Sequence, residues 1–176
     1  MKNDSKRKTG FNYWNKFFLS IIPILLLSYS PAGFSSGELG EINNMSNLQV
    51  VEAIYKGFES GDMDAILGSM SDDIVWLHPG RPDQIPFAGK FEGTAGVQRF
   101  FDTAFSLIDV LDQQIHSFES SGDKVIVIGY EHMRVKSTGK EYQSNWIHMY
   151  TVADGKAVAF EEFIDTAALV AAFTSN

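Results

Sequence analysis

Apolar side chains recur at helical spacing in three stretches of the chain. Ser46 or Asn47 can cap the first helix, and Gly61, which suits a left-handed C-terminal position, ends it. A short second helix follows, and Thr94 caps a third whose wide apolar stripe is typical of a core-facing helix. The apolar positions of the three are Val50, Val51, Ile54, Tyr55 and Phe58; Ala65, Ile66, Leu67 and Met70; and Val97, Phe100, Phe101, Ala104, Phe105 and Ile108.

The other apolar runs are short and rich in β-branched and aromatic residues, which is typical of strands. Two of them lie between the second and third helices, and four more follow the third helix in succession. The predicted strands are 74–78, 87–92, 114–120, 124–136, 141–153 and 156–164, and a short alanine-rich helix over 166–173 follows them. This order predicts an α+β fold: a curved, mostly antiparallel sheet wrapped around three helices, forming a cone-shaped α+β barrel with an open end.

The hairpin over residues 145–165 is the best-defined local feature. Asp154-Gly155 separates two strand-like runs, and an Asp-Gly pair so placed is a strong hairpin signal. Period-two alternation separates Trp146, His148 and Tyr150 from Ile147, Met149 and Thr151, and separates Phe160 and Glu162 from Glu161, Phe163 and Asp165. We expect the aromatic face to line a pocket that Asp165 closes.

The first 32 residues are predicted to be a secretory signal. A basic segment ending at Lys16 precedes about a dozen apolar residues, and Ser30 and Ala32 suit the two positions before a cleavage site. Pro23 interrupts the apolar run, which is short for a membrane span, and an uncleaved N-terminal anchor is the alternative. Residues 33–46 are small and polar and predict a flexible leader, so the folded domain is expected to comprise residues 47–176.

Export has a direct test. Protein recovered from the cell envelope or the medium should begin near Gly33, and its intact mass should lack the signal. Full-length protein found only in a membrane fraction would indicate the anchor instead.

Composition limits the classes of partner. Without the signal, 9 basic side chains face 21 acidic ones, a net charge of −12 that repels nucleic-acid backbones. The absence of cysteine excludes a disulfide framework and lipoprotein attachment. A neutral, cationic or largely apolar small molecule is easier to accommodate, and a hydrophobic small molecule is the predicted partner.

Four segments of the chain resemble a known family. They are Trp76 to Gly80; Pro86 to Gly89 with Gly93 and Val97 to Phe101; Gly129 to Glu131 with Thr138 to Lys140; and Trp146 to Thr166. Together they resemble the SnoaL-like polyketide cyclase and ketosteroid-isomerase-related proteins of the nuclear transport factor 2-like superfamily. The resemblance implies a cone fold that hosts isomerases, cyclases, lyases and non-catalytic domains alike, so it does not assign a reaction.

The resemblance also implies acid–base chemistry in an apolar cone, where desolvation lifts a carboxyl pKa. The first-strand position of the isomerase base falls among Trp76, Leu77 and His78, which include no carboxylate, whereas Asp165 resembles the cyclase base. The predicted catalytic residues are therefore Asp165 and His148, and the predicted ligand-binding residues are Tyr55, Trp76, His78, Phe101, Glu131, Trp146, Tyr150 and Phe163.

Alternatives remain open for several of these residues. Asp165 can instead cap the helix that begins at Thr166. Glu131 interrupts an apolar strand and needs a partner, which Arg134 or His148 could supply. The four histidines lack metal-site spacing, and no phosphate-binding loop is present, so no metal or cofactor is predicted.

Two functions are compatible with these features. The first is a cofactor-independent isomerase, cyclase or lyase with a His/Asp acid–base pair; the second is a non-catalytic ligand-binding or interaction module of the same fold. We also expect a homodimer, because an apolar outer sheet face would expose a larger patch than monomers usually tolerate. The residues predicted for that face are Ile126, Ile128, Ile147, Met149 and Val152.

Overall fold

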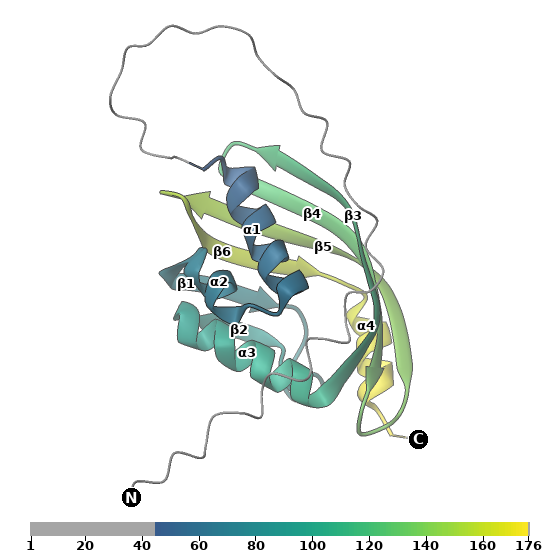
Figure 1. The fold of residues 1–176 in the computed structure, drawn as a ribbon. Helices are drawn as coiled ribbons and strands as arrows, with labels where there is room; N and C mark the ends of the chain where they lie inside the picture. The colour runs from purple at the N-terminus through teal and green to yellow at the C-terminus, as the bar shows by residue number, and fades with distance from the viewer. Residues whose placement is uncertain (1–44, 176) are drawn as a thin grey trace, which may run out of the picture.

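The structure, a computed structural model, describes residues 45–175 (Figure 1). The predicted signal over residues 1–32 lies outside the described residues, and so does all of the predicted leader except Met45 and Ser46. None of the helices that the structure describes is both long enough and apolar enough to cross a membrane.

Four helices are present in the described part of the chain: α1 (Asn47–Ser60), α2 (Met63–Gly68), α3 (Gly93–Leu107) and α4 (Thr166–Phe173). Ser46 caps α1 through a capping box with Gln49, which satisfies two backbone N–H groups that would otherwise lack partners. The predicted cap of α3, Thr94, is wrong by two residues, because the N-cap is Glu92, whose side chain forms no capping hydrogen bond. The helix begins at Gly93, whose positive φ turns the chain directly from a strand into the helix.

Six strands form one sheet: β1 (Met70–His78), β2 (Gly89–Glu92), β3 (Ile108–Ser121), β4 (Lys124–Val135), β5 (Glu141–Ala153) and β6 (Lys156–Phe163). Their order is β2-β1-β6-β5-β4-β3. Every pair is antiparallel except β1 with β6, which is parallel. β3 starts six residues earlier than the predicted 114–120 because the chain passes from α3 into the strand without a loop.

The sheet curves around α1, α2 and α3, which lie on its inner face, and α4 follows the end of β6 (Figure 1). The α+β cone predicted from the sequence is confirmed. Alternation places Val125 and Val127 of β4 and Tyr150 of β5 in the core between the sheet and the helices. This arrangement leaves the inner face of the long strands as the wall of a cavity.

The outer face of the sheet is apolar in its centre, but one predicted member is wrong. Ile128 pairs with Ile147, and Ile147 pairs with Phe163, so three apolar side chains form a row across β4, β5 and β6. Ile147 is 40% exposed and Phe163 is 47% exposed. Val152, in contrast, is buried on the inner face, because it has the same strand parity as Tyr150.

Candidate active site

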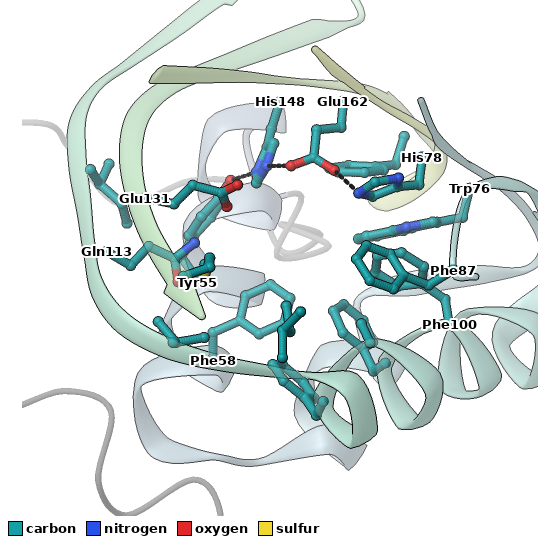
Figure 2. A pocket seen from close by; sticks show the side chains of 18 of the residues that line it. Tyr55, Phe58, Trp76, His78, Phe87, Phe100, Gln113, Glu131, His148 and Glu162 are labelled. Atoms are coloured by element: carbon teal, nitrogen blue, oxygen red, sulfur yellow. Dashed lines mark hydrogen bonds and ion pairs between the residues drawn. The ribbon is translucent and has the colours of Figure 1, made fainter. Parts of the chain in front are cut away.

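A cavity of about 130 Å³ lies between the helices and the inner face of the sheet. Phenylalanine rings from α1, α3 and the β1–β2 loop supply much of its wall, and the polar side chains come mainly from β4, β5 and β6. Figure 2 shows this division: His148, Glu162 and His78 lie together at one side of the cavity, and Phe58 lies across from them. The cavity is therefore apolar with a concentrated polar cluster.

Glu162 is the centre of that cluster. Its Oε1 lies 3.1 Å from Nε2 of His148, and its Oε2 lies 3.2 Å from Nε2 of His78 (Figure 2). The side chains of His78 and Glu162 are 5% and 9% exposed, so the contacts are protected from solvent. The strand pairing of the sheet brings the three residues together. His148 and Glu162 are direct partners across β5 and β6, and Leu77, the residue before His78, pairs with Glu161, the residue before Glu162.

The hydrogen bonds of His148 define its tautomer. Its Nδ1 lies 2.6 Å from the hydroxyl of Tyr55, which donates to it when Nε2 carries the proton that faces Glu162. The indole of Trp146 stacks on the imidazole with ring centroids 4.0 Å apart and fixes the ring plane. A neutral His148 therefore satisfies the carboxylate and the phenol at the same time.

His78 lies between a backbone acceptor and the carboxylate of Glu162. Its Nδ1 lies 2.9 Å from the carbonyl oxygen of Pro79, which can only accept, so Nδ1 donates. Its Nε2 lies at an ion-pair distance of 3.2 Å from Oε2 of Glu162, so a proton on Nε2 would face the carboxylate. The His78–Glu162 pair is thus placed to share a proton inside the cavity.

The cavity shifts the pKa of both partners. Burial alone would raise the pKa of Glu162, but the hydrogen bond from His148 and the electrostatic influence of both imidazoles outweigh it and hold that pKa below its usual range. Burial lowers the pKa of His78, and Glu162 offsets only part of this effect. Glu162 is accordingly the group in the cluster that we expect to be ionised.

The pKa of Glu131 on β4 is shifted in the opposite direction to that of Glu162. Burial, together with the charge of Glu162, raises its pKa to about 8, and a hydrogen bond with Tyr142 opposes the shift only in part. The predicted partners Arg134 and His148 are wrong. Arg134 faces the other side of β4 and bonds Glu141, and His148 is occupied by Tyr55 and Glu162.

Three polar atoms of the cavity-lining residues have no hydrogen-bond partner among the described residues: Oε1 of Glu131, Nε1 of Trp76 and the hydroxyl oxygen of Tyr150. Trp76 is buried and its indole stacks on Phe160 with centroids 3.6 Å apart, which fixes its position in the wall. Buried polar atoms without partners are uncommon, and at a cavity wall they indicate where a guest can bond.

The structure brings most of the predicted site residues together. Those that line the cavity are Tyr55, Trp76, His78, Phe101, Glu131, His148 and Tyr150. Trp146 lies behind the wall because its indole covers Gly129 of β4, where a Cβ would come within 2.1 Å of the ring. Phe163 does not line the cavity, since it lies on the outer face of β6.

The predicted pairing of Asp165 with His148 is wrong, and the capping alternative is confirmed. Asp165 is the N-cap of α4, where its Oδ1 accepts from the backbone N–H of Ala168 at 3.0 Å. Its own N–H donates to the hydroxyl of Ser144, which holds it beyond the end of β6. Glu162 has the place beside His148 that the prediction gave to Asp165.

Glu162 is the residue that sequence reasoning missed as a site residue. Counting back from the Asp154-Gly155 turn places Glu161 opposite His148, but a bulge between Thr151 and Val152 shifts the register by one residue. Alternation alone already placed Glu162 on the same face as Phe160. The sequence could therefore have identified Glu162, because it is the acidic residue of β6 that alternation places on the inner face.

The fold and the site together define a protein of the nuclear transport factor 2-like superfamily. The chain belongs to the SnoaL-like domain family, whose model matches residues 51–160. Among curated proteins, none matches the chain significantly.

Solved structures of the same superfamily resemble the chain. A nuclear transport factor 2-like protein from Burkholderia xenovorans LB400 is 29% identical, with 73% of this chain and 95% of that chain covered and a TM-score of 0.66. TerC, co-crystallised with polyporic acid, is 27% identical, with 72% and 97% covered and a TM-score of 0.62. A relative from Burkholderia thailandensis E264 is 24% identical, with 74% and 98% covered and a TM-score of 0.68, which shows the fold alone.

Proposed function

We propose that the protein is a cofactor-independent enzyme of the isomerase, cyclase or lyase type, which moves a proton on a small, largely apolar carbonyl compound. The observation that carries this proposal is the buried carboxylate of Glu162, held between His78 and His148 in an otherwise apolar cavity. Pairs of titratable groups whose pKa values are driven apart, as in Glu162 and Glu131, are typical of acid–base sites.

Glu162 is the proposed base. Its Oε1 accepts a hydrogen bond from His148, its Oε2 lies at ion-pair distance from His78, and both oxygens keep a further lone pair. In the proposed step, this carboxylate takes a proton from the carbon beside the guest carbonyl. The C–H electron pair becomes the C=C bond of an enolate, and the negative charge moves to the carbonyl oxygen.

The histidines stabilise the charge that this step creates. When one proton lies between His78 and Glu162, the proton taken from the guest gives the pair a positive charge opposite the enolate. His148 stays neutral and keeps the carboxyl oriented, with Tyr55 and Trp146 holding its ring in turn. Both ring nitrogens of His148 and Nδ1 of His78 are hydrogen-bonded, and Nε2 of His78 faces Glu162, so the histidines act on the guest through Glu162.

The cavity volume supports a single-ring guest. A cavity of about 130 Å³ is close to the roughly 150 Å³ of an engineered cavity that holds benzene. The related TerC was co-crystallised with polyporic acid, which supports a small-molecule ligand for this family.

Deuterium exchange tests the proposal without knowledge of the natural substrate. The protein is incubated with acetophenone in D₂O, and NMR follows the loss of the methyl protons beside the carbonyl. We expect exchange above the rate with an equal concentration of an unrelated acidic protein. Acetophenone that binds without any accelerated exchange would instead support the non-catalytic binding module.

We further propose that the chain is exported and forms a homodimer through the outer sheet face. The row of Ile128, Ile147 and Phe163 supports the dimer, because it leaves contiguous apolar surface on three adjacent strands.

Light scattering at micromolar concentration is expected to give twice the monomer mass for the wild type. Ile147→Glu places a charge in the centre of the apolar row and should give the monomer mass, since an unpaired charge is costly to bury. Gln143→Glu is the matched control, because Gln143 lies on the same strand and face but outside the row, and it should stay dimeric. A monomeric wild type would contradict the interface.

A further inference from the structure

Glu131 is a buried carboxyl whose two oxygens differ in their surroundings. The residue is 6% exposed and points into the cavity from β4, beside Gln113 of β3 (Figure 2). One oxygen bonds with Tyr142, and the other, Oε1, has no hydrogen-bond partner among the described residues. A carboxyl oxygen that is buried at a cavity wall without a partner is placed to bond a guest.

The groups that face Glu131 include no cation of permanent charge. No lysine or arginine lines the cavity in the described part of the chain. The titratable side chains around it come from α1, β1, β5 and β6: Tyr55, Glu59, His78, Tyr142, His148, Tyr150 and Glu162. Since Glu162 is the ionised carboxylate of the site, a second charge on Glu131 would be both desolvated and repelled.

These surroundings favour the neutral carboxylic acid. Tyr142 then donates to the carbonyl-type oxygen of Glu131, and the proton is carried by Oε1, the oxygen that has no partner among the described residues. A neutral carboxyl raised to a pKa of about 8 keeps that proton at physiological pH.

We propose that Glu131 determines the substrate class of this site by donating a hydrogen bond from Oε1 to an uncharged acceptor oxygen, such as a ketone, on an otherwise apolar ring. The proposal deepens the proposed function and rests on it for the identity of the pocket as the substrate site. A carboxylate guest of the same shape is disfavoured, because the cavity wall offers it no lysine or arginine. A hydrocarbon of the same shape leaves the Oε1 donor without a partner.

Three ligands of matched shape test the selection: acetophenone, isopropylbenzene and benzoate. Their dissociation constants are measured by NMR chemical-shift titration at pH 6.5 and pH 9.5, with no turnover required. At pH 6.5 the wild type should bind acetophenone about 3- to 10-fold more tightly than isopropylbenzene, the scale of one neutral hydrogen bond, and benzoate least. At pH 9.5 the preference for acetophenone should disappear, since ionised Glu131 no longer donates.

Two variants of Glu131 separate the effect of its hydrogen-bond donor from the effect of its ionisation. Glu131→Gln keeps an N–H donor of the same reach, so the preference for acetophenone should persist but become independent of pH. Glu131→Leu removes the donor and should abolish the preference at both pH values. Glu119→Gln, at an exposed position of β3, is the control and should behave as the wild type does.

These measurements distinguish a failure of the proposed role of Glu131 from a failure of the proposed catalytic function. A wild-type preference that does not change with pH, or that persists in Glu131→Leu, would overturn the role of Glu131. So would a failure of all three ligands to bind at pH 6.5. If Glu131→Leu does not fold, the pH response of Glu131→Gln still decides the question. A pH-dependent preference without deuterium exchange would uphold Glu131 as the selecting residue and refute catalysis.

Discussion

Replacing Glu162 with glutamine is expected to slow deuterium exchange into acetophenone by about 10²-fold or more, the usual scale for lost acid–base assistance. Glutamine has the same size and can still accept a hydrogen bond from Nε2 of His148, so the geometry of the cavity should persist. It provides neither the charge nor the basic oxygen that the proposed step needs. The rate should therefore fall much more than the affinity for acetophenone.

Glu161→Gln is the matched control for this experiment. Glu161 precedes Glu162 on β6, has the same side chain and lies on the other face of the sheet. Its replacement should leave exchange within about 3-fold of the wild type, a change of less than 1 kcal/mol in the barrier. If Glu162→Gln also exchanges at the wild-type rate while it remains folded, the base is another group and the His78–Glu162–His148 cluster is structural.

The inward positions of β5 could be predicted because alternation along a strand is a local property. Period two alone assigned His148 and Tyr150 to the aromatic face, and both line the cavity. The same rule assigned Phe163 and Asp165 to the face opposite Phe160, so their inclusion in the pocket needed an additional bend. The chain instead leaves the sheet after Phe163 and begins α4.

The partner of His148 could not be predicted with the same security, because pairing across strands depends on register. The bulge near Thr151 changes which β6 residue stands opposite His148, and no turn or proline marks it in the sequence. The position of Trp146 likewise depends on a neighbouring strand. The absence of a side chain at Gly129 is what lets the indole lie against β4, behind the cavity wall.

The cluster around Glu162 shows how a sequence with no carboxylate at the isomerase-type position can still place a buried carboxylate beside a histidine in the cavity. His78 stands on β1 where that base was sought, and the parallel neighbour β6 supplies the carboxylate beside it. The fold thus brings a histidine and a carboxylate together from strands that are far apart in sequence. This pairing across strands is visible only once the strand order β1-β6-β5 is known.

The stability of the folded protein is expected to depend on pH through Glu131. Its pKa is about 8 in the folded state and near 4.5 for an ordinary glutamate. Below pH 4.5 both states hold the proton, and Glu131 imposes no penalty. Between pH 4.5 and 8 only the unfolded state ionises, so the free energy of unfolding falls as pH rises; above pH 8 the folded state ionises too and the decrease ends.

The loss across that window should be on the order of 5 kcal/mol, from about 1.4 kcal/mol for each unit of pKa difference. Urea denaturation of the wild type and of Glu131→Gln at pH 5, 6, 7, 8 and 9 measures it. Glutamine does not ionise, so the stability of the variant relative to the wild type should rise steadily from pH 5 to pH 8 and then level off. Contributions from histidines and from Glu162 are largely common to both proteins and cancel in the difference.

The control variant Glu119→Gln should instead give a stability curve parallel to that of the wild type at every pH. Parallel curves for the wild type and Glu131→Gln would mean that Glu131 is already ionised in the folded protein, and the cavity would then hold two carboxylates and no carboxylic acid donor.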